Sequence, residues 1–92
     1  MWHVYLLRCN DKSLYCGITK DLKRRVYEHN NTARSAKYTR ARRPVSLVWA
    51  KDVQTRSDAL RLEHRIKKLK KIQKEMIVTN ADDSYDIFSS CL

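Results

Sequence analysis

The sequence has little cysteine and no long apolar run. Its three cysteines, Cys9, Cys16 and Cys91, are odd in number and show no Cys-x-x-Cys spacing, so neither a disulfide framework nor a zinc site is expected. No apolar stretch approaches the roughly 20 residues that span a bilayer, and no basic-then-apolar leader follows Met1. We therefore expect free thiols in a reducing compartment and a cytoplasmic protein without a membrane segment.

Acidic residues are also scarce relative to basic ones. Twenty Lys and Arg oppose ten Asp and Glu, which gives a formal net charge of +10. Three of the acids lie in 80–92, where there is no Lys or Arg, so residues 1–79 carry +13. An acidic polymer relieves the self-repulsion of such a surface. The charge favours nucleic acid over an anionic membrane, because no expected helix pairs a lysine-rich face with a large apolar face.

The apolar patterning predicts one small α+β domain at 1–79, followed by an acidic, mobile tail at 80–92. We expect a three-stranded antiparallel sheet flanked by helices, in the order β-β-α-β-α-α. The strands are expected at 2–9, 14–18 and 45–53, and the helices at about 21–30, 56–70 and 72–78. A basic loop is expected at 31–44, and Val45, Leu47 and Trp49 are expected to share one face of the third strand.

The only glycine, Gly17, lies inside an apolar strand pattern, where glycine costs stability and marks a bulge or a close approach. The first two strands are expected to form a hairpin. If a three-residue loop with a bulge joins them, Tyr5 lies opposite Gly17 and Leu7 opposite Tyr15. The phenol rings of Tyr5 and Tyr15 then both lie over Gly17, the one position that has no side chain.

The first expected helix places Leu22, Arg25, Val26 and His29 on one face. Leu22 and Val26 should point into the core, which puts a cation and an imidazole at its inward edge. Arg25 and His29 either serve a site there or extend past a packed stem to water.

In the second expected helix, Glu63 borders the apolar stripe. Glu63 is either a functional carboxylate or the partner of Lys67 in an i,i+4 ion pair. The apolar stripe consists of Ala59, Leu62, Ile66 and Leu69.

Basic residues gather in two segments, 31–44 and the end of the second expected helix. Basic side chains interleaved with a tyrosine suit phosphate contacts and a stacking or hydrogen-bonding group, so we favour nucleic-acid contact over a merely solvated basic surface. The candidate nucleic-acid-binding residues are Arg34, Lys37, Tyr38, Arg40, Arg42, Arg43, Lys67, Lys70 and Lys71.

Several of these residues stand in the order and spacing of a known family. His3-Val4-Tyr5 and Tyr15-Cys16-Gly17 stand where its two half-motifs would be, and Arg25, His29 and Glu63 follow at matching places. Over roughly residues 2–77 the chain resembles the GIY-YIG nuclease superfamily. Ala36 to Arg40 resembles a loop of its small stand-alone bacterial-type members. His3 and Cys16 depart from the motif letters, and Ile18 stands where excision-repair members carry lysine.

The resemblance implies a metal-dependent DNA endonuclease that hydrolyses phosphodiester bonds. It implies that Glu63 binds one Mg²⁺ or Mn²⁺ and that Arg25 holds the scissile phosphate. Tyr5 or Tyr15 would be the general base or would position the water, and His29 could relay the proton instead. The DNA could be branched or damaged, and a protein partner could target the enzyme. The alternatives are a non-catalytic nucleic-acid-binding module and a partner subunit on the same fold.

Overall fold

The computed structural model describes residues 1–79, and the predicted acidic tail at 80–92 lies outside the described residues. The strands are β1 (Trp2–Arg8), β2 (Leu14–Thr19) and β3 (Ser46–Val53). The helices are α1 (Leu22–Asn31), α2 (Lys37–Arg40), α3 (Arg56–Lys68) and α4 (Lys71–Thr79). The predicted α+β class is confirmed. The basic segment at 31–44 was wrongly predicted as loop throughout, because α2 forms within it.

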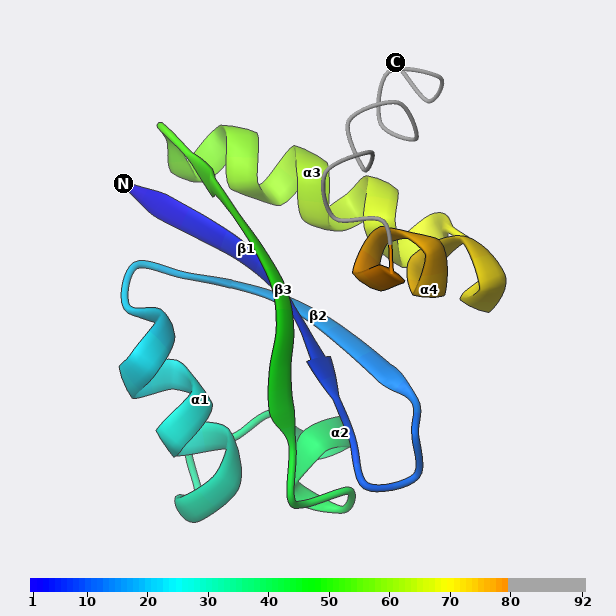
Figure 1. The fold of residues 1–92 in the computed structure, drawn as a ribbon. Helices are drawn as coiled ribbons and strands as arrows, with labels where there is room; N and C mark the ends of the chain where they lie inside the picture. Colours follow the sequence, from blue (N-terminus) through cyan, green and yellow to red (C-terminus); the bar gives the residue numbers. More distant parts are fainter. Residues whose placement is uncertain (80–92) are drawn as a thin grey trace.

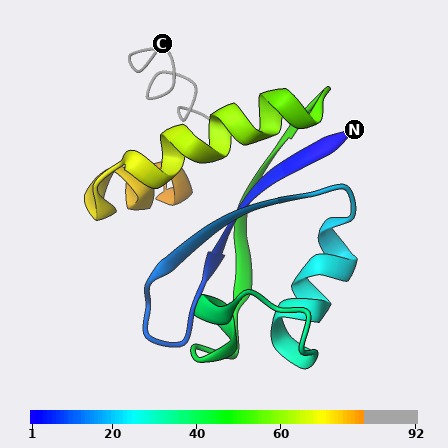
Figure 2. The ribbon, with the colours of Figure 1, turned by 180° about the vertical axis from the view of Figure 1, so that it is seen from behind.

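The three strands form one antiparallel sheet in the order β2-β1-β3, so β1 is central and β2 lies at an edge. Helices cover both faces: α1 and α2 lie on one side and α3 and α4 on the other (Figures 1 and 2). None of the helices within residues 1–79 has the length and apolar character needed to cross a membrane.

The β1–β2 hairpin has the predicted register. Tyr5 pairs with Gly17 and Leu7 with Tyr15. The amide of Cys9 donates to the Ser13 carbonyl at 2.9 Å, which closes a three-residue loop, and Lys12 within it has a left-handed φ of 69°. A turn followed by a left-handed residue is the geometry that produces this register. It puts both tyrosines on the face that α1 covers.

Strand β3 contains a β-bulge. Leu6 pairs with Trp49 and the next residue, Leu7, pairs with Leu47, so Val48 is the extra residue. A bulge shifts the alternation of side chains by one position. The prediction that Val45, Leu47 and Trp49 share a face was therefore wrong. Val45 and Trp49 pack in different clusters, Val45 beside Leu7 and Trp49 beside Leu6.

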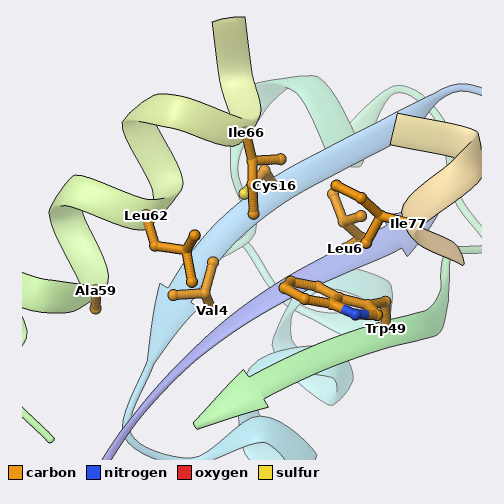
Figure 3. Close-up of a cluster of buried hydrophobic side chains, with 8 residues drawn as sticks. All are labelled: Val4, Leu6, Cys16, Trp49, Ala59, Leu62, Ile66 and Ile77. Atoms are coloured by element: carbon orange, nitrogen blue, oxygen red, sulfur yellow. The ribbon is translucent and has the colours of Figure 1, made fainter. Parts of the chain in front are cut away.

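Two apolar clusters hold the layers together. The larger cluster lies between the sheet and α3 and α4, as Figure 3 shows, and the smaller one lies on the α1 side. The larger consists of Val4, Leu6, Cys16, Trp49, Ala59, Leu62, Ile66 and Ile77. The smaller consists of Tyr5, Leu7, Cys9 and Val45, with Tyr15, Leu22 and Val26 packed against it. Two of these seven members are tyrosines, so the thinner core carries hydroxyl groups to the edge of the sheet.

Local capping fixes where the two long helices begin. An oxygen of the Asp21 side chain accepts from the amide of Arg24 at 3.1 Å at the start of α1. The Thr55 hydroxyl accepts from the amide of Asp58 at 3.1 Å at the start of α3. These caps satisfy amides that have no partner within the helix. They therefore help to fix which residues of each helix turn toward the sheet.

Candidate active site

The ring of Tyr5 crosses from the central strand over Gly17 of β2. A Cβ at position 17 would lie 2.4 Å from the Tyr5 Oη, 2.6 Å from its Cζ and 3.2 Å from Cε2 of Tyr15. Gly17 does not have a positive φ, so it supplies space rather than an unusual backbone conformation. The expected close approach over Gly17 is confirmed, and both phenols take part in it.

A chain of hydrogen bonds runs from Tyr5 into the protein. The Tyr5 hydroxyl lies 2.8 Å from Nε2 of His29, and Nδ1 of His29 lies 2.7 Å from the Thr39 hydroxyl. Both His29 and Thr39 are 0% exposed. Of the two alternatives for His29, extension of the side chain to water is therefore wrong. The helix α1 instead delivers the imidazole to the tyrosine rings, with centroids 5.9 Å from Tyr5 and 5.3 Å from Tyr15.

Burial keeps the partners of this chain neutral. It lowers the pKa of His29 to about 4, with the Arg25 guanidinium as the next cause. It also raises the pKa of Tyr5 above its usual range, an effect that the nearby Tyr15 increases and Arg25 opposes. At neutral pH the resting state is therefore a neutral phenol hydrogen-bonded to a neutral imidazole.

The Arg25 guanidinium is partly buried and lies within a cationic hollow. Its Nη1 donates to Oε1 of Glu28 at 3.1 Å and to the Arg34 carbonyl at 2.8 Å. Arg24 also pairs with Glu28, at 3.3 Å. The hollow is lined by Thr19, Lys20, Asp21, Arg24, Arg25, Glu28 and Arg34. The sequence pattern did not indicate a role for Glu28. Its carboxylate forms ion pairs with Arg24 and Arg25, the arginines that would hold a phosphate.

Glu63 approaches from the opposite layer. Its side chain is 18% exposed, and Oε2 lies 3.4 Å from Nζ of Lys67. The link to the other residues is Tyr15 on the edge strand. Burial raises the pKa of Tyr15. The positive charges of Lys67 and Arg25 oppose this rise, and the Glu63 carboxylate adds to it. Charges from both layers, Arg25 on α1 and Glu63 on α3, thus act on one phenol.

Three arginines of the basic segment donate hydrogen bonds to backbone carbonyls of the segment itself or of α1, and Arg42 also pairs with Asp11 of the β1–β2 loop. Arg40 donates to the Ala33 carbonyl at 2.7 Å and Arg43 to the His29 carbonyl at 2.7 Å. Arg42 donates to the Tyr38 carbonyl at 3.0 Å. Hydrogen bonds with a charged donor are among the stronger ones. These residues, predicted to contact nucleic acid, therefore also brace the loop.

The ring of Tyr38 has two ring contacts. It stacks on Tyr15 with centroids 6.0 Å apart, and Cζ of Arg42 lies 3.8 Å from its centroid in a cation–π contact. Tyr38 is nevertheless 38% exposed, so part of the side chain remains accessible.

Only a site completed by other ligands would hold a metal here. Within residues 1–79 there is no group of three or more His, Cys, Asp or Glu placed to bind an ion. One carboxylate, Glu63, suits Mg²⁺ or Mn²⁺, which bind to one or two protein carboxylates and keep waters or substrate phosphates as the other ligands. The same donor set does not suit zinc, which takes three or four protein ligands. The residues present therefore fit a hard cation bound together with substrate.

The order of these residues matches a known family. Residues 1–76 match the GIY-YIG catalytic domain. The chain belongs to the GIY-YIG family. The family supports a nuclease-type function and a nucleic-acid substrate.

Several known proteins are similar to this chain over most of their length. The UPF0213 protein DP2720 of Desulfotalea psychrophila is 42% identical over 84 residues, which cover 91% of this chain and 76% of that protein. The UPF0213 protein YhbQ of Salmonella arizonae is 44% identical over 89 residues, covering 97% and 88%. The solution NMR structure of EF2693 from E. faecalis aligns with a TM-score of 0.59 at 40% identity, covering 87% of this chain and 84% of that one.

Proposed function

We propose that this GIY-YIG protein is a DNA endonuclease that hydrolyses phosphodiester bonds with one Mg²⁺ or Mn²⁺. The observation that carries the proposal is the contact of two tyrosines and a histidine at the β2 edge. Tyr5, Tyr15 and His29 are in contact over Gly17, and Arg25 and Glu63 act on Tyr15 from opposite layers. Phosphodiester hydrolysis needs a positioned water, charge stabilisation at the phosphate and a path for a proton.

Glu63 would hold the metal, with waters and phosphate oxygens completing its ligands. When bound, the ion would neutralise charge that develops on the phosphate and on the leaving oxygen. Nζ of Lys67 lies 3.4 Å from Oε2 of Glu63, so the exposed Lys67 side chain has to move away when the cation binds. Ion pairs with an exposed partner are worth at most about 1 kcal/mol, so little stability is lost when this pair breaks.

Arg25 would hold the scissile phosphate in the cationic hollow. Its planar guanidinium matches two phosphate oxygens, and Lys20, Arg24 and Arg34 add positive charge around it. The phosphate competes with the Glu28 carboxylate for Arg25. Neutralising Arg25 with phosphate also removes one cause of the low pKa of His29, which makes the imidazole a better proton acceptor when substrate is bound.

Tyr5 and His29 would remove the proton from the attacking water. The water proton bonds to Oη of Tyr5 as the phenolic proton passes to Nε2 of His29 across 2.8 Å. The water oxygen bonds to phosphorus, the bond from phosphorus to the leaving sugar oxygen breaks, and that oxygen takes a proton from solvent. Tyr15, half-buried beside both groups, would position the water.

The remaining basic side chains would bind the flanking DNA. Arg34, Lys37, Lys67, Lys70 and Lys71 are exposed, and the side chains of Arg34 and Lys37 make no ion pair within residues 1–79. Arg40, Arg42, Arg43 and Tyr38 would shape the loop and offer their free edges. Branched or damaged DNA is the proposed substrate class, with a protein partner as a possible source of targeting.

The second candidate is a nucleic-acid-binding module without catalysis. The ion pairs of Arg25 with Glu28 and of Glu63 with Lys67 favour it, because both functional groups already have partners. A single experiment separates the two candidates.

The test is cleavage of supercoiled plasmid and of branched DNA in Mg²⁺, Mn²⁺ or EDTA. Wild type should nick in either metal and not in EDTA. Glu63→Gln should reduce the rate by on the order of 100-fold or more, the loss typical when a group that stabilises transition-state charge is removed. DNA affinity in EDTA should stay the same.

The matched control is Asp58→Asn, which neutralises a carboxylate of the same helix at an exposed ion pair with Arg61. Its cleavage should equal that of wild type. Binding without cleavage by the wild type would support the module instead, and unfolding of Glu63→Gln would make Glu63 a structural residue.

A further inference from the structure

The hydrogen-bond chain behind Tyr5 has a direction. The Thr39 hydroxyl donates its one proton to the Ala36 carbonyl at 3.0 Å. Its oxygen must therefore accept from Nδ1 of His29, 2.7 Å away. A neutral imidazole that donates through Nδ1 has a lone pair on Nε2, and that nitrogen accepts from the Tyr5 hydroxyl at 2.8 Å.

We propose that Thr39 is a positioning residue that holds His29 in its Nδ1-protonated tautomer, so that Nε2 is free to take the phenolic proton of Tyr5. The proposal rests on the nuclease function proposed above. In the step, the O–H bond electrons of Tyr5 stay on its oxygen, and the proton bonds to the lone pair of Nε2. The Nδ1–H bond to Thr39 is kept throughout.

Burial fixes the donor-to-acceptor direction of this hydrogen-bond chain. His29 and Thr39 are 0% exposed, so water does not replace a missing partner of the imidazole nitrogens or of the threonine hydroxyl. No fully buried side-chain nitrogen or oxygen in the described part of the chain is without a hydrogen bond. The reverse direction would take the Thr39 proton away from Ala36 and make Nε2 a donor to Tyr5. In that state the imidazole could not accept the phenolic proton.

The helix α2 places Thr39 beside the imidazole of His29. Thr39 lies three residues after Ala36, the spacing at which a threonine in a helical turn bonds back to a carbonyl. Arg43 donates to the carbonyls of His29 and Thr32, and so joins the end of α1 to the segment that carries Thr39. Arg40 donates to the Ala33 carbonyl from within α2. These arginine hydrogen bonds thus help to hold the segment that carries Thr39 beside α1.

Nitrogen NMR of the ¹⁵N-histidine-labelled full chain tests the tautomer without using activity. His29 signals are assigned by their loss in His29→Gln. Wild type should carry its proton on Nδ1. Thr39→Val, which has the same shape but no hydroxyl, should shift the proton wholly or partly to Nε2. Thr39→Ser, which keeps the hydroxyl, should retain the wild-type tautomer.

Single-turnover cleavage of DNA by the same variants tests the consequence. Thr39→Val should be slower by roughly 10–100-fold, the usual cost of removing a group that orients a functional histidine. Thr39→Ser should restore the rate, and DNA affinity should be the same in all three. If Thr39→Val does not fold, Thr39→Ala replaces it, because alanine removes the hydroxyl without adding a methyl beside the imidazole.

A wild-type His29 protonated on Nε2 would overturn the proposal, as would a Thr39→Val protein with the wild-type tautomer. A changed tautomer with an unchanged cleavage rate would also overturn it. If wild type does not cleave but the tautomer depends on the Thr39 hydroxyl, the nuclease function fails while the orientation of His29 by Thr39 stands.

Discussion

Gly17 shows how one residue can be required for what it lacks. Its backbone is not left-handed, so other residues could adopt its conformation. The atoms 2.4 and 2.6 Å from an added Cβ belong to the rigid ring of Tyr5, which cannot bend away as the end of a flexible chain would. The site therefore depends on a gap in β2 through which a central-strand tyrosine reaches the histidine.

Gly17→Ala should destabilise the fold by about 1–3 kcal/mol, as overpacking of a filled site does, and should slow cleavage by displacing Tyr5. Chemical denaturation measures the first effect and the single-turnover rate the second. In a Tyr5→Leu background the stability cost of Gly17→Ala should shrink, because the clashing ring atoms are gone. An equal cost in both backgrounds would contradict the ring clash as its cause.

The elements are held in place by a few specific contacts. The guanidinium of Arg8 binds Glu75 through two hydrogen bonds, of 2.5 and 2.6 Å, which connect the end of β1 to α4. Both side chains are about a third exposed, at 29% and 30%. Ile77 of α4 is fully buried in the larger cluster. Buried Ile77, with Val78 packed beside the cluster, and the bidentate ion pair therefore help to hold the short helix α4 in place.

Glu75→Gln should lower the free energy of unfolding by about 1 kcal/mol. This value is at the upper end of the range for partly exposed ion pairs, because the Arg8–Glu75 pair is bidentate. The loss should shrink at high salt, which screens the pair in wild type. Hydrogen exchange of the α4 amides should accelerate more than that of α1. Asp58→Asn, at the exposed pair with Arg61, is the control and should change little. Equal acceleration in α1 and α4 would show that the pair does not hold α4 locally.

At the scale of the whole molecule, two of the candidate DNA-binding lysines act on β2 or on the hairpin loop that leads into it. Burial raises the pKa of Tyr15 in β2 and Lys67 lowers it, and Nζ of Lys71 donates to the Lys12 carbonyl in the β1–β2 loop at 3.4 Å. Strand β3 forms the opposite edge of the sheet and carries the exposed Lys51. This layout predicts that DNA lies along the β2 edge.

Binding of DNA should weaken with salt, and the logarithmic slope should fall by about 1 for each phosphate contact removed. Lys70→Ala and Lys71→Ala should each reduce that slope, and Lys51→Ala should leave it unchanged. Titrations of a fluorescent duplex at several salt concentrations in EDTA measure it. A loss as large for Lys51→Ala as for the other two would place the DNA elsewhere or show a diffuse charge effect.

Local chemistry in the sequence determined the elements and part of the site. Apolar alternation predicted the strands, and a three-residue hairpin loop, if formed, put Tyr5 opposite Gly17. In the structure Asp21 and Thr55 cap α1 and α3 through amides three residues further along the chain. These features depend on residues a few positions apart, so periodicity, capping and turn rules suffice to find them. The ordered motif residues were likewise sufficient to indicate the family.

Tertiary structure alone decided the rest. Neither the bulge at Val48, nor the inward course of Arg40 and Arg43, nor the aim of Thr39 at His29 follows from local patterns. Each depends on which surface a segment folds against, and a buried polar group must find its partner there at a cost if it does not. The charges of the basic segment at 31–44 predicted a nucleic-acid-binding surface. The packing of the segment's buried Thr39 against α1 turned part of it into a support for His29, the candidate proton acceptor.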